Sequence, residues 1–319
     1  MPAQAKVKRP PVLHAGPQLD ARLMLMAPIV ALVTDFGYTD YYAGALKGAI
    51  KIHCPECELI DVTHGIPKFD IWSGAFVAYH SFRFLPQGTT LLVVVDPGVG
   101  GGRRIIYSNC DGKHVVGPDN GVVYPIVSNC AETFCVDAEE YSGSLTFQAR
   151  DIMSAVAADL ASGKGYPGVP IHDPEPLPGW DEKPKLQMGK LKARIIYHDS
   201  YGNLVTNIRS SDFPFKGRAI LKSKEGVFNA SFSKNYEGAG VLLVPDSYGL
   251  IEIALSRSSA REALGLSAGD EVELEEIRSR PHSWTVPALS SRPSKGRHLC
   301  LLPVRNALHR SWKLTGKWN

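Results

Sequence analysis

The 319-residue sequence lacks several patterns that would place it at once in a well-known class of protein. It has no uninterrupted apolar run of the ~18 residues that a membrane-spanning helix requires. Its glycine-rich stretch does not make a dinucleotide-binding fingerprint, because Arg103 stands where the third glycine would fall. Gly-Lys-Ser/Thr does not occur, and the Gly-x-Ser-x-Gly run Gly265-Leu-Ser-Ala-Gly269 follows a helical pattern and not a strand, so it does not support a hydrolase serine. The sequence therefore predicts neither a P-loop protein nor a serine hydrolase.

The spacing that metal sites use is also missing. The histidines are scattered and show no His-x3-His pattern, and Cys54 and Cys57 form the one Cys-x2-Cys pair among the six cysteines. A zinc site usually needs a second pair, and a redox pair usually begins a helix, whereas this one follows a helical pattern. We therefore expect structural or incidental thiols that are mostly reduced, no metal and no cofactor, and a cytoplasmic protein.

The charge is distributed unevenly along the chain. Residues 1–27 carry +3 and residues 278–319 carry +9, so the total of +3 leaves −9 for residues 28–277. An acidic body argues against a nucleic-acid-binding surface on the folded part of the protein. Neither end of the chain has a regular hydrophobic period. We expect a disordered leader over 1–27 and a disordered basic tail over 278–319.

Strand and helix patterns alternate over residues 28–163. Apolar runs predict strands at 29–34, 59–62 and 90–95, and further short strands are expected at 105–108, 115–116 and 133–136. Helical patterns predict helices at 39–53, 70–84 and 150–162. Thr39 and Asp70 are the expected N-caps of the first two helices. This alternation predicts an N-terminal α/β domain with a mainly parallel sheet.

The pattern changes after residue 163. Residues 164–189 are rich in Gly, Pro and Asp, which indicates a linker between domains. Residues 190–277 contain short strand patterns with frequent turns and one short helical pattern at 259–264. Such a segment predicts a smaller β-barrel or sandwich domain.

Polar residues follow several of the predicted strands. Asp96 comes directly after the apolar strand at 90–95, and Arg103 follows it after a run of glycines. Asp35 ends the first strand in the same way. Ligands of open α/β sheets bind beyond the carboxyl ends of the strands, where Asp35 is well placed to accept hydrogen bonds from ribose hydroxyls. The alternatives are a surface salt bridge for Asp96 and Arg103, and a turn cap for Asp35.

The ordered motifs of the chain resemble one family. The motifs are Thr34-Asp-Phe-Gly-Tyr-Thr-Asp40, Asp61-Val-Thr-His-Gly-Ile66, Val95-Asp-Pro-Gly-Val-Gly100, Pro118-Asp-Asn-Gly121, Tyr201-Gly-Asn-Leu-Val-Thr-Asn-Ile208 and Asp246-Ser-Tyr-Gly249. Together they resemble the S-adenosylmethionine (SAM) hydroxide adenosyltransferases, which are relatives of the SAM-dependent chlorinases and fluorinases. The resemblance covers residues 28–277.

This resemblance implies an α/β N-terminal domain, a C-terminal β-barrel and a homotrimer with SAM bound at the subunit interface, without nucleic acid or membrane as a partner. The implied reaction is attack of water on C5′ of the SAM ribose, which gives adenosine and L-methionine. The residues that the resemblance implies for SAM binding are Asp35 on the ribose hydroxyls, Phe69 beside the ribose, Phe232 on adenine, and Asp199, Asn203 and Ser247 at the methionine end.

The resemblance also implies the catalytic residues. Asp96 and Arg103 match two members of the family's Asp-Arg-His set, and halogenases have tyrosine at the position of Asp96. Gln148 stands where the set has histidine, and a glutamine can hydrogen-bond a water but cannot accept its proton. The main hypothesis is a SAM hydrolase. The alternatives are a SAM- or adenosine-binding protein whose turnover is weak or lost because of Gln148, and a halogenase.

Overall fold

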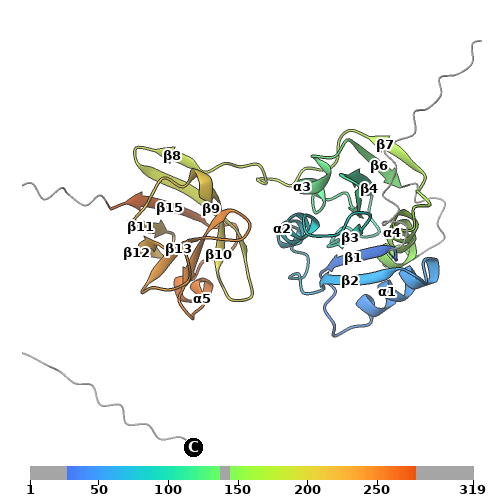
Figure 1. Cartoon of the computed structure of the whole chain (residues 1–319), viewed down its shortest axis with the longest axis horizontal. Coiled ribbons are helices and arrows are strands. Elements are labelled where there is room, and N and C mark those ends of the chain that lie inside the picture. The colour runs from blue at the N-terminus through green and yellow to red at the C-terminus, as the bar shows by residue number, and fades with distance from the viewer. Residues whose placement is uncertain (1–26, 137–143, 278–319) are drawn as a thin grey trace, which may run out of the picture. The chain divides into compact units, whose positions relative to one another are not determined.

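A computed structural model describes residues 27–136 and 144–277 of the chain. Within these residues the chain forms two sheets, and residues 27–171 hold a seven-stranded sheet in the order β2-β1-β3-β5-β4-β6-β7 (Figure 1). Its strands are β1 (Ile29–Thr34), β2 (Glu58–Thr63), β3 (Thr90–Val94), β4 (Ile105–Cys110), β5 (Lys113–Pro118), β6 (Glu132–Val136) and β7 (Gly168–Ile171). Strands β2, β1, β3 and β5 are mutually parallel, as the alternating pattern predicts, and the remaining pairings are antiparallel.

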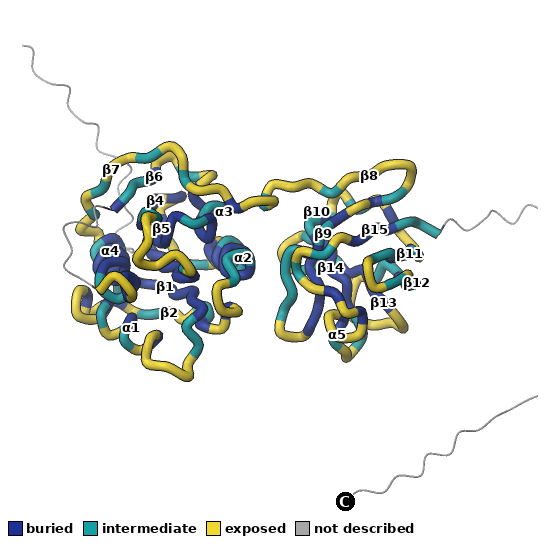
Figure 2. Tube along the Cα trace, turned by 180° about the vertical axis from the view of Figure 1, so that it is seen from behind, coloured by how far each residue is buried: buried dark blue, intermediate teal, exposed yellow. Residues whose placement is uncertain are grey.

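Helices cover both faces of this sheet. They are α1 (Tyr42–His53), α2 (Ile71–Phe82), α3 (Tyr124–Val127) and α4 (Ser154–Ala161), the last preceded by a π-helical segment (Ala149–Met153). Helices α1 and α4 pack on one face against Val30 and Leu32, whereas α2 and α3 pack on the other against Ala31 and Val33. Alternate residues of β1 thus reach opposite cores, which explains why the strand is apolar throughout and wholly buried (Figure 2).

The second sheet closes into a barrel. Strands β10-β14-β13-β12-β11-β15-β9 are hydrogen-bonded in that order, β9 pairs with β10 to complete the ring, and β8 is added outside β9. The strands are β8 (Lys185–Gln187), β9 (Lys190–His198), β10 (Leu204–Arg209), β11 (Arg218–Ser223), β12 (Gly226–Phe232), β13 (Val241–Pro245), β14 (Leu250–Leu255) and β15 (Glu271–Glu276). A 3-10 turn (Ser210–Asp212) and helix α5 (Ala260–Leu264) lie between strands. The predicted fold class, an α/β domain followed by a smaller β-barrel, is confirmed.

The structure corrects several local expectations. Helix α1 begins at Tyr42 and has no side-chain cap, so the expected start at Thr39 is wrong, whereas Asp70 caps α2 as predicted by accepting from the Ser73 N–H. The expected helix at 150–162 begins instead with the π-helical segment. Strands β7 and β8 lie inside the predicted linker 164–189; β7 contains a glycine and a proline, β8 has three residues, and both are held by backbone pairing with β6 and β9. The expected leader and basic tail lie outside the described residues, except for Ala27.

The cysteine expectation also needs correction. Cys54 is bonded to Cys57, and Cys110 is bonded to Cys130, so these four residues are disulfides and not the reduced thiols that the sequence predicted. The first pair spans the turn after α1. The second joins the end of β4 to the segment after α3, and only the fold brings these residues, 20 positions apart, within reach of each other. No helix of the described residues is long and apolar enough to cross a membrane.

Candidate active site

Asp35, which is predicted to bind the ribose, and Asp96, which is predicted to be catalytic, follow two neighbouring parallel strands. Thr34 at the end of β1 pairs with Val94 at the end of β3, and the Asp35 N–H donates to the Val94 carbonyl at 3.3 Å. Asp35 and Asp96 therefore emerge at the same edge of the sheet. Between β1 and β3 the connecting helices change faces, since α1 covers one face and α2 the other. Such a switch point opens the crevice in which α/β sheets bind ligands.

Asp96 and Arg103 form a desolvated ion pair across the glycine-rich loop. Arg103 Nε donates to Asp96 Oδ1 at 3.1 Å and to Oδ2 at 2.9 Å, and Nη2 donates to Oδ2. Only 5% of the Asp96 side chain and 10% of the Arg103 side chain are exposed. The two-pronged geometry fixes the orientation of the carboxylate. The two charged side chains are buried although the loop between them, residues 97–102, is exposed, so a surface turn closed by a salt bridge stays an alternative for this pair.

The strand end before Asp96 is held from the side by Asn120. Its Nδ2 donates to the Val95 carbonyl at 3.0 Å, and its Oδ1 accepts from the Val122 N–H at 3.1 Å. One amide side chain thus connects the end of β3 to the turn after β5. Together with Arg103, it fixes Asp96 from both its backbone and its side-chain end.

Asp35 is buried and holds the next loop. Its Oδ2 accepts from the Phe69 N–H at 2.9 Å, and the residue is 7% exposed. Phe69 has a left-handed backbone with φ of 65°, which is uncommon outside glycine and costs conformational energy. Its ring is exposed, beside the Asp35 carboxylate that fixes its backbone. This arrangement leaves the second Asp35 oxygen available to a ligand.

Gln148 lies directly before the π-helical segment. The residue is 9% exposed, and its Oε1 has no hydrogen-bond partner among the described residues. The adjacent Phe147 packs edge-on against Phe36 in the loop after β1, at 5.8 Å between ring centroids. A Cβ on Gly100 would lie 2.8 Å from the Leu145 carbonyl, so the Asp96–Arg103 loop passes against the same segment. The loops of the predicted N-terminal site residues thus meet at one edge of the sheet.

The remaining predicted residues lie on the barrel. Asp199 Oδ1 accepts from the Asn203 N–H at 2.9 Å, and Oδ2 accepts from Asn203 Nδ2 at 3.0 Å, so these side chains form one unit in the turn between β9 and β10. Ser247 is exposed in the turn after β13. Phe232 ends β12 and stacks on Phe213 at 5.7 Å.

The predicted Asp199 has two acidic neighbours that were not predicted as site residues, the partly buried Asp246 and the buried Glu252. We call Asp199, Asp246 and Glu252 the barrel acids; none of them takes part in an ion pair of the described residues. Asp246 Oδ2 and Glu252 Oε1 are buried without a hydrogen-bond partner among those residues. Burial raises the pKa of Asp246 and of Glu252. Burial and a hydrogen bond to Glu252 raise the pKa of Tyr236 well above its ordinary value.

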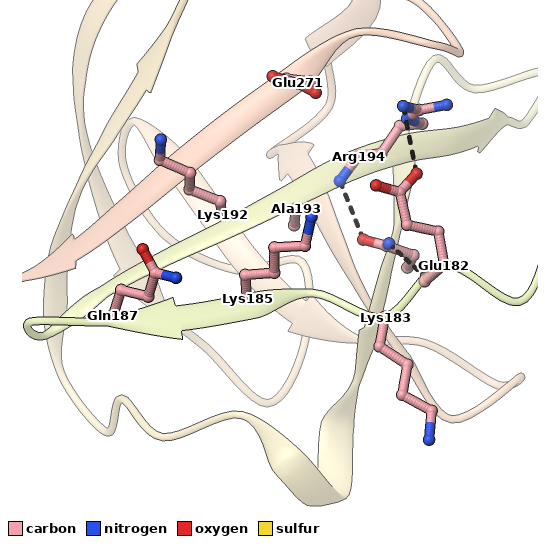
Figure 3. A pocket seen from close by; sticks show the side chains of 9 residues that line it. Glu182, Lys183, Lys185, Gln187, Lys192, Ala193, Arg194 and Glu271 are labelled. Atoms are coloured by element: carbon pink, nitrogen blue, oxygen red, sulfur yellow. Dashed lines mark hydrogen bonds and ion pairs between the residues drawn. The ribbon is translucent and has the colours of Figure 1, made fainter. Parts of the chain in front are cut away.

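A cavity of about 270 Å³ on the outside of the barrel is a poor candidate site (Figure 3). Lys185, Lys192 and Arg194 line it, which would suggest an anion site. However, β15 places Glu271 opposite Arg194 and Glu273 opposite Lys192 across the sheet. Opposite charges on facing positions stabilise a sheet, so this cavity lies in a structural charge ladder.

Known proteins identify the class to which this fold and these loops belong. The family model of the SAM hydroxide adenosyltransferase N-terminal domain matches residues 30–169, and that of the C-terminal domain matches residues 193–273. The chain therefore belongs to the SAM hydroxide adenosyltransferase family.

Individual relatives agree with this assignment. The chain is 30% identical over 262 residues to an (R)-S-adenosyl-L-methionine hydrolase of Methanocaldococcus jannaschii, covering 77% of this chain and 95% of that protein. It is 30% identical over 266 residues to an enzyme of the same name from Thermus thermophilus, covering 78% and 100%. A solved structure of an uncharacterised conserved protein from Thermotoga maritima superposes with a TM-score of 0.71 at 30% identity, covering 78% of this chain and all of that one.

Proposed function

We propose that this chain hydrolyses S-adenosyl-L-methionine to adenosine and L-methionine. The observation that carries the proposal is the pair of buried carboxylates, Asp35 and Asp96, at the ends of adjacent parallel strands that flank a switch point. One carboxylate is free to bind ribose hydroxyls, and the other is oriented by Arg103. Membership in the family and the names of the similar enzymes support the same reaction.

The proposed step needs little acid catalysis. The water oxygen forms a bond to C5′, the C5′–S bond breaks, and its electron pair neutralises the sulfonium, so methionine leaves as a neutral thioether. The water loses one proton to the medium in the overall reaction. The protein must hold SAM and one water in line and exclude other water. Asp96 and Arg103 would orient this water, with the unpartnered Gln148 Oε1 as a further acceptor.

The binding roles follow the chemistry of each side chain. Asp35 would accept from the ribose hydroxyls beside the ring of Phe69, and Phe232 would pack on adenine. Asp199, Asn203 and Ser247 would bind the methionine end. A positively charged ammonium group suits the barrel acids, because these carboxylates have no cation of their own among the described residues.

We further propose a homotrimer whose site lies at the subunit interface. Large apolar side chains are exposed around the loops of the site; they are Tyr38, Tyr41, Phe69, Val99 and Leu145. Several large exposed apolar side chains around one set of loops favour an interaction surface. Light scattering on the purified protein would give the mass of three chains, and the mass of one chain would contradict the proposal.

The proposed domain boundaries are 28–163 and 190–277. We also propose that the protein is cytoplasmic and that SAM is its substrate, with no cofactor. Disulfides are rare in the cytoplasm, so the Cys54–Cys57 and Cys110–Cys130 bonds count against that location. Thiol alkylation in freshly lysed cells, followed by mass spectrometry, would give the state of these cysteines.

Incubation with SAM and chromatography of the nucleoside product test the function. We expect adenosine, with or without chloride, and a rate about 10²-fold lower for Asp96→Ala, because an oriented acceptor at the reacting water is lost. Asp181→Ala removes an exposed aspartate and is the matched control. Binding of SAM without adenosine release would favour a binding protein, and a chlorinated nucleoside would favour a halogenase.

A further inference from the structure

A chain of hydrogen bonds that begins in the buried sheet and ends at the surface lies beside Asp35 and includes none of the predicted site residues. Thr34 Oγ1 and His64 Nδ1 are 2.7 Å apart, and His64 Nε2 lies 3.2 Å from Asp61 Oδ1. Asp61 Oδ2 accepts from Lys47 Nζ at 2.6 Å and from the Tyr38 hydroxyl at 2.9 Å. The His64 side chain is fully buried, and so is Thr34. We call Thr34, His64 and Asp61 the strand-end relay.

The direction of each hydrogen bond in the relay can be assigned. The charged Asp61 side chain only accepts, so His64 Nε2 must carry a proton and donate. Burial lowers the pKa of His64, which favours the neutral ring with a lone pair on Nδ1. The Thr34 hydroxyl then donates to Nδ1 while its oxygen accepts from the Phe36 N–H at 3.2 Å. Every polar atom of the relay is thus satisfied in one arrangement.

The relay connects the two loops that hold Asp35. The backbone adds two bonds between them, from the Gly37 N–H to the His64 carbonyl at 2.6 Å and from the Ile66 N–H to the Thr34 carbonyl at 3.3 Å. Further along the second loop, the Phe69 N–H donates to Asp35 Oδ2. The Asp35 carboxylate is therefore placed by the register between these loops. Of the side-chain bonds between the loops, Tyr38 to Asp61 and Lys68 to the Phe36 carbonyl are exposed, whereas Thr34–His64 is buried.

The geometry excludes a role for Thr34 as a nucleophile. A hydroxyl, an imidazole and a carboxylate in series resemble the triad of hydrolases. However, Thr34 has no exposed surface, and its hydroxyl oxygen already accepts from a backbone N–H. Its side chain cannot reach a substrate without opening the sheet. The relay can act on a ligand only through Asp35.

We propose that Thr34 and His64 are positioning residues that set the Asp35 carboxylate for the ribose hydroxyls. This inference rests on the proposed function, because it assumes a nucleoside ligand at Asp35. It gives the relay a specific consequence: its loss weakens recognition of the ribose hydroxyls and leaves recognition of the rest of the nucleoside intact.

The experiment uses the full chain and compares the dissociation constants of adenosine and 2′,3′-dideoxyadenosine by calorimetry. Thr34→Val removes the hydroxyl at constant shape, and Thr34→Ser keeps it. Thr90→Val is the matched control, since Thr90 is also fully buried in this sheet and its Oγ1 has no hydrogen-bond partner among the described residues. His64→Leu removes the other half of the bond.

We expect the unchanged protein to bind adenosine more tightly than the dideoxy compound, by about tenfold or more. Thr34→Val and His64→Leu should reduce this ratio toward one while the affinity for the dideoxy compound stays within about twofold. Thr34→Ser and Thr90→Val should keep the ratio.

Equal loss of affinity for both compounds in Thr34→Val would overturn the proposal, since it would indicate a general structural role. An unchanged ratio in Thr34→Val and His64→Leu would overturn it as well. Failure of the proposed function looks different: the unchanged protein would then bind neither adenosine nor SAM, and both ideas would fall together. Should His64→Leu not fold, which its melting curve would reveal, the Thr34→Val and Thr34→Ser comparison still decides.

Discussion

At the carboxyl edge of the N-terminal sheet, Asp96 is paired with an arginine, whereas the barrel acids accept from neutral donors and have no cation among the described residues. Asp96 is paired with Arg103, and Asp35 accepts from the Phe69 N–H. On the barrel, Asp246 and Glu252 each keep a buried oxygen without a partner among the described residues. The first region is balanced before any ligand binds. The second carries an uncompensated negative charge, which suits a cationic part of a ligand and costs stability until one binds.

We expect the largest effect from Gln148→His, which adds a base at the carboxyl edge of the N-terminal sheet. General-base assistance is worth ~10²–10⁴-fold, and Gln148 cannot provide it. We expect Gln148→His to raise the rate of adenosine release from SAM by about 10²-fold, with a pH dependence around pH 6–7 where a histidine titrates. Combining it with Asp96→Ala should gain less, because both groups act on one water. A flat rate from pH 5 to 9 with SAM still bound would contradict this assignment.

Breaking the balance should destabilise the N-terminal sheet. Arg103→Ala leaves the Asp96 carboxylate buried and unpaired, which typically costs ~3–5 kcal/mol of the free energy of unfolding. The control is Lys164→Ala, which breaks an exposed pair with Asp159 and should cost less than about 1 kcal/mol. Urea denaturation of the two variants measures the difference. Similar losses in both would show that Asp96 is not as desolvated as its 5% exposure indicates.

The N-terminal half should lose stability in acid. Burial, followed by the nearby Arg83, lowers the pKa of His80 in α2 from 6.5 to about 4. The unfolded chain binds this proton more readily than the folded one, so stability is full above pH 6.5 and falls as the pH drops toward 4, by about 3 kcal/mol. In His80→Gln this part of the loss should be absent. The exposed His172→Gln is the control, and parallel curves for both variants would argue against the assignment.

The barrel acids should show the opposite sign and the smallest effect. Because the pKa of Glu252 is raised in the folded state, its share of stability is present in acid and is lost as the pH rises through that pKa. Glu252→Gln removes the charge, and we expect it to gain about 1 kcal/mol at pH 8 and little at pH 4. The exposed Glu225→Gln should change stability at neither pH. Destabilisation by Glu252→Gln at pH 8, measured by urea denaturation, would show that the comparison of the two regions is wrong.

The parts of the fold that depend on local pattern could be predicted from the sequence. Strand β1 at 29–34 and the Asp70 cap are found as expected, because apolar runs and capping side chains act within a few residues. Strands β7 and β8 could not be predicted, since both are very short, β7 contains glycine and proline, and only pairing with β6 and β9 makes them strands. The Cys110–Cys130 bond depends on how α3 returns to β4, which no spacing encodes.

The site divides in the same way. Asp35 and Asp96 were found because an acid directly after an apolar strand is visible in the sequence. Of the barrel acids, Asp199 was predicted as a site residue, whereas Glu252 was missed, because it lies within strand β14 and only its burial distinguishes it from a solvated strand residue. The strand-end relay was missed for a similar reason. His64 is one of several scattered histidines in the sequence, and only the pairing of β1 with β2 brings Thr34 and Asp61 to its two ring nitrogens.

Phe69 combines a strained backbone with an exposed aromatic ring. Selection for stability and selection for activity should therefore favour different residues at this position. Glycine adopts a left-handed backbone at little cost, so a screen for heat-resistant variants would accept Phe69→Gly. A screen for turnover should reject it, because the same change deletes the ring that we propose to lie beside the ribose. In variants of this chain, glycine at residue 69 would therefore indicate selection for thermal stability, and an aromatic residue would indicate selection for turnover.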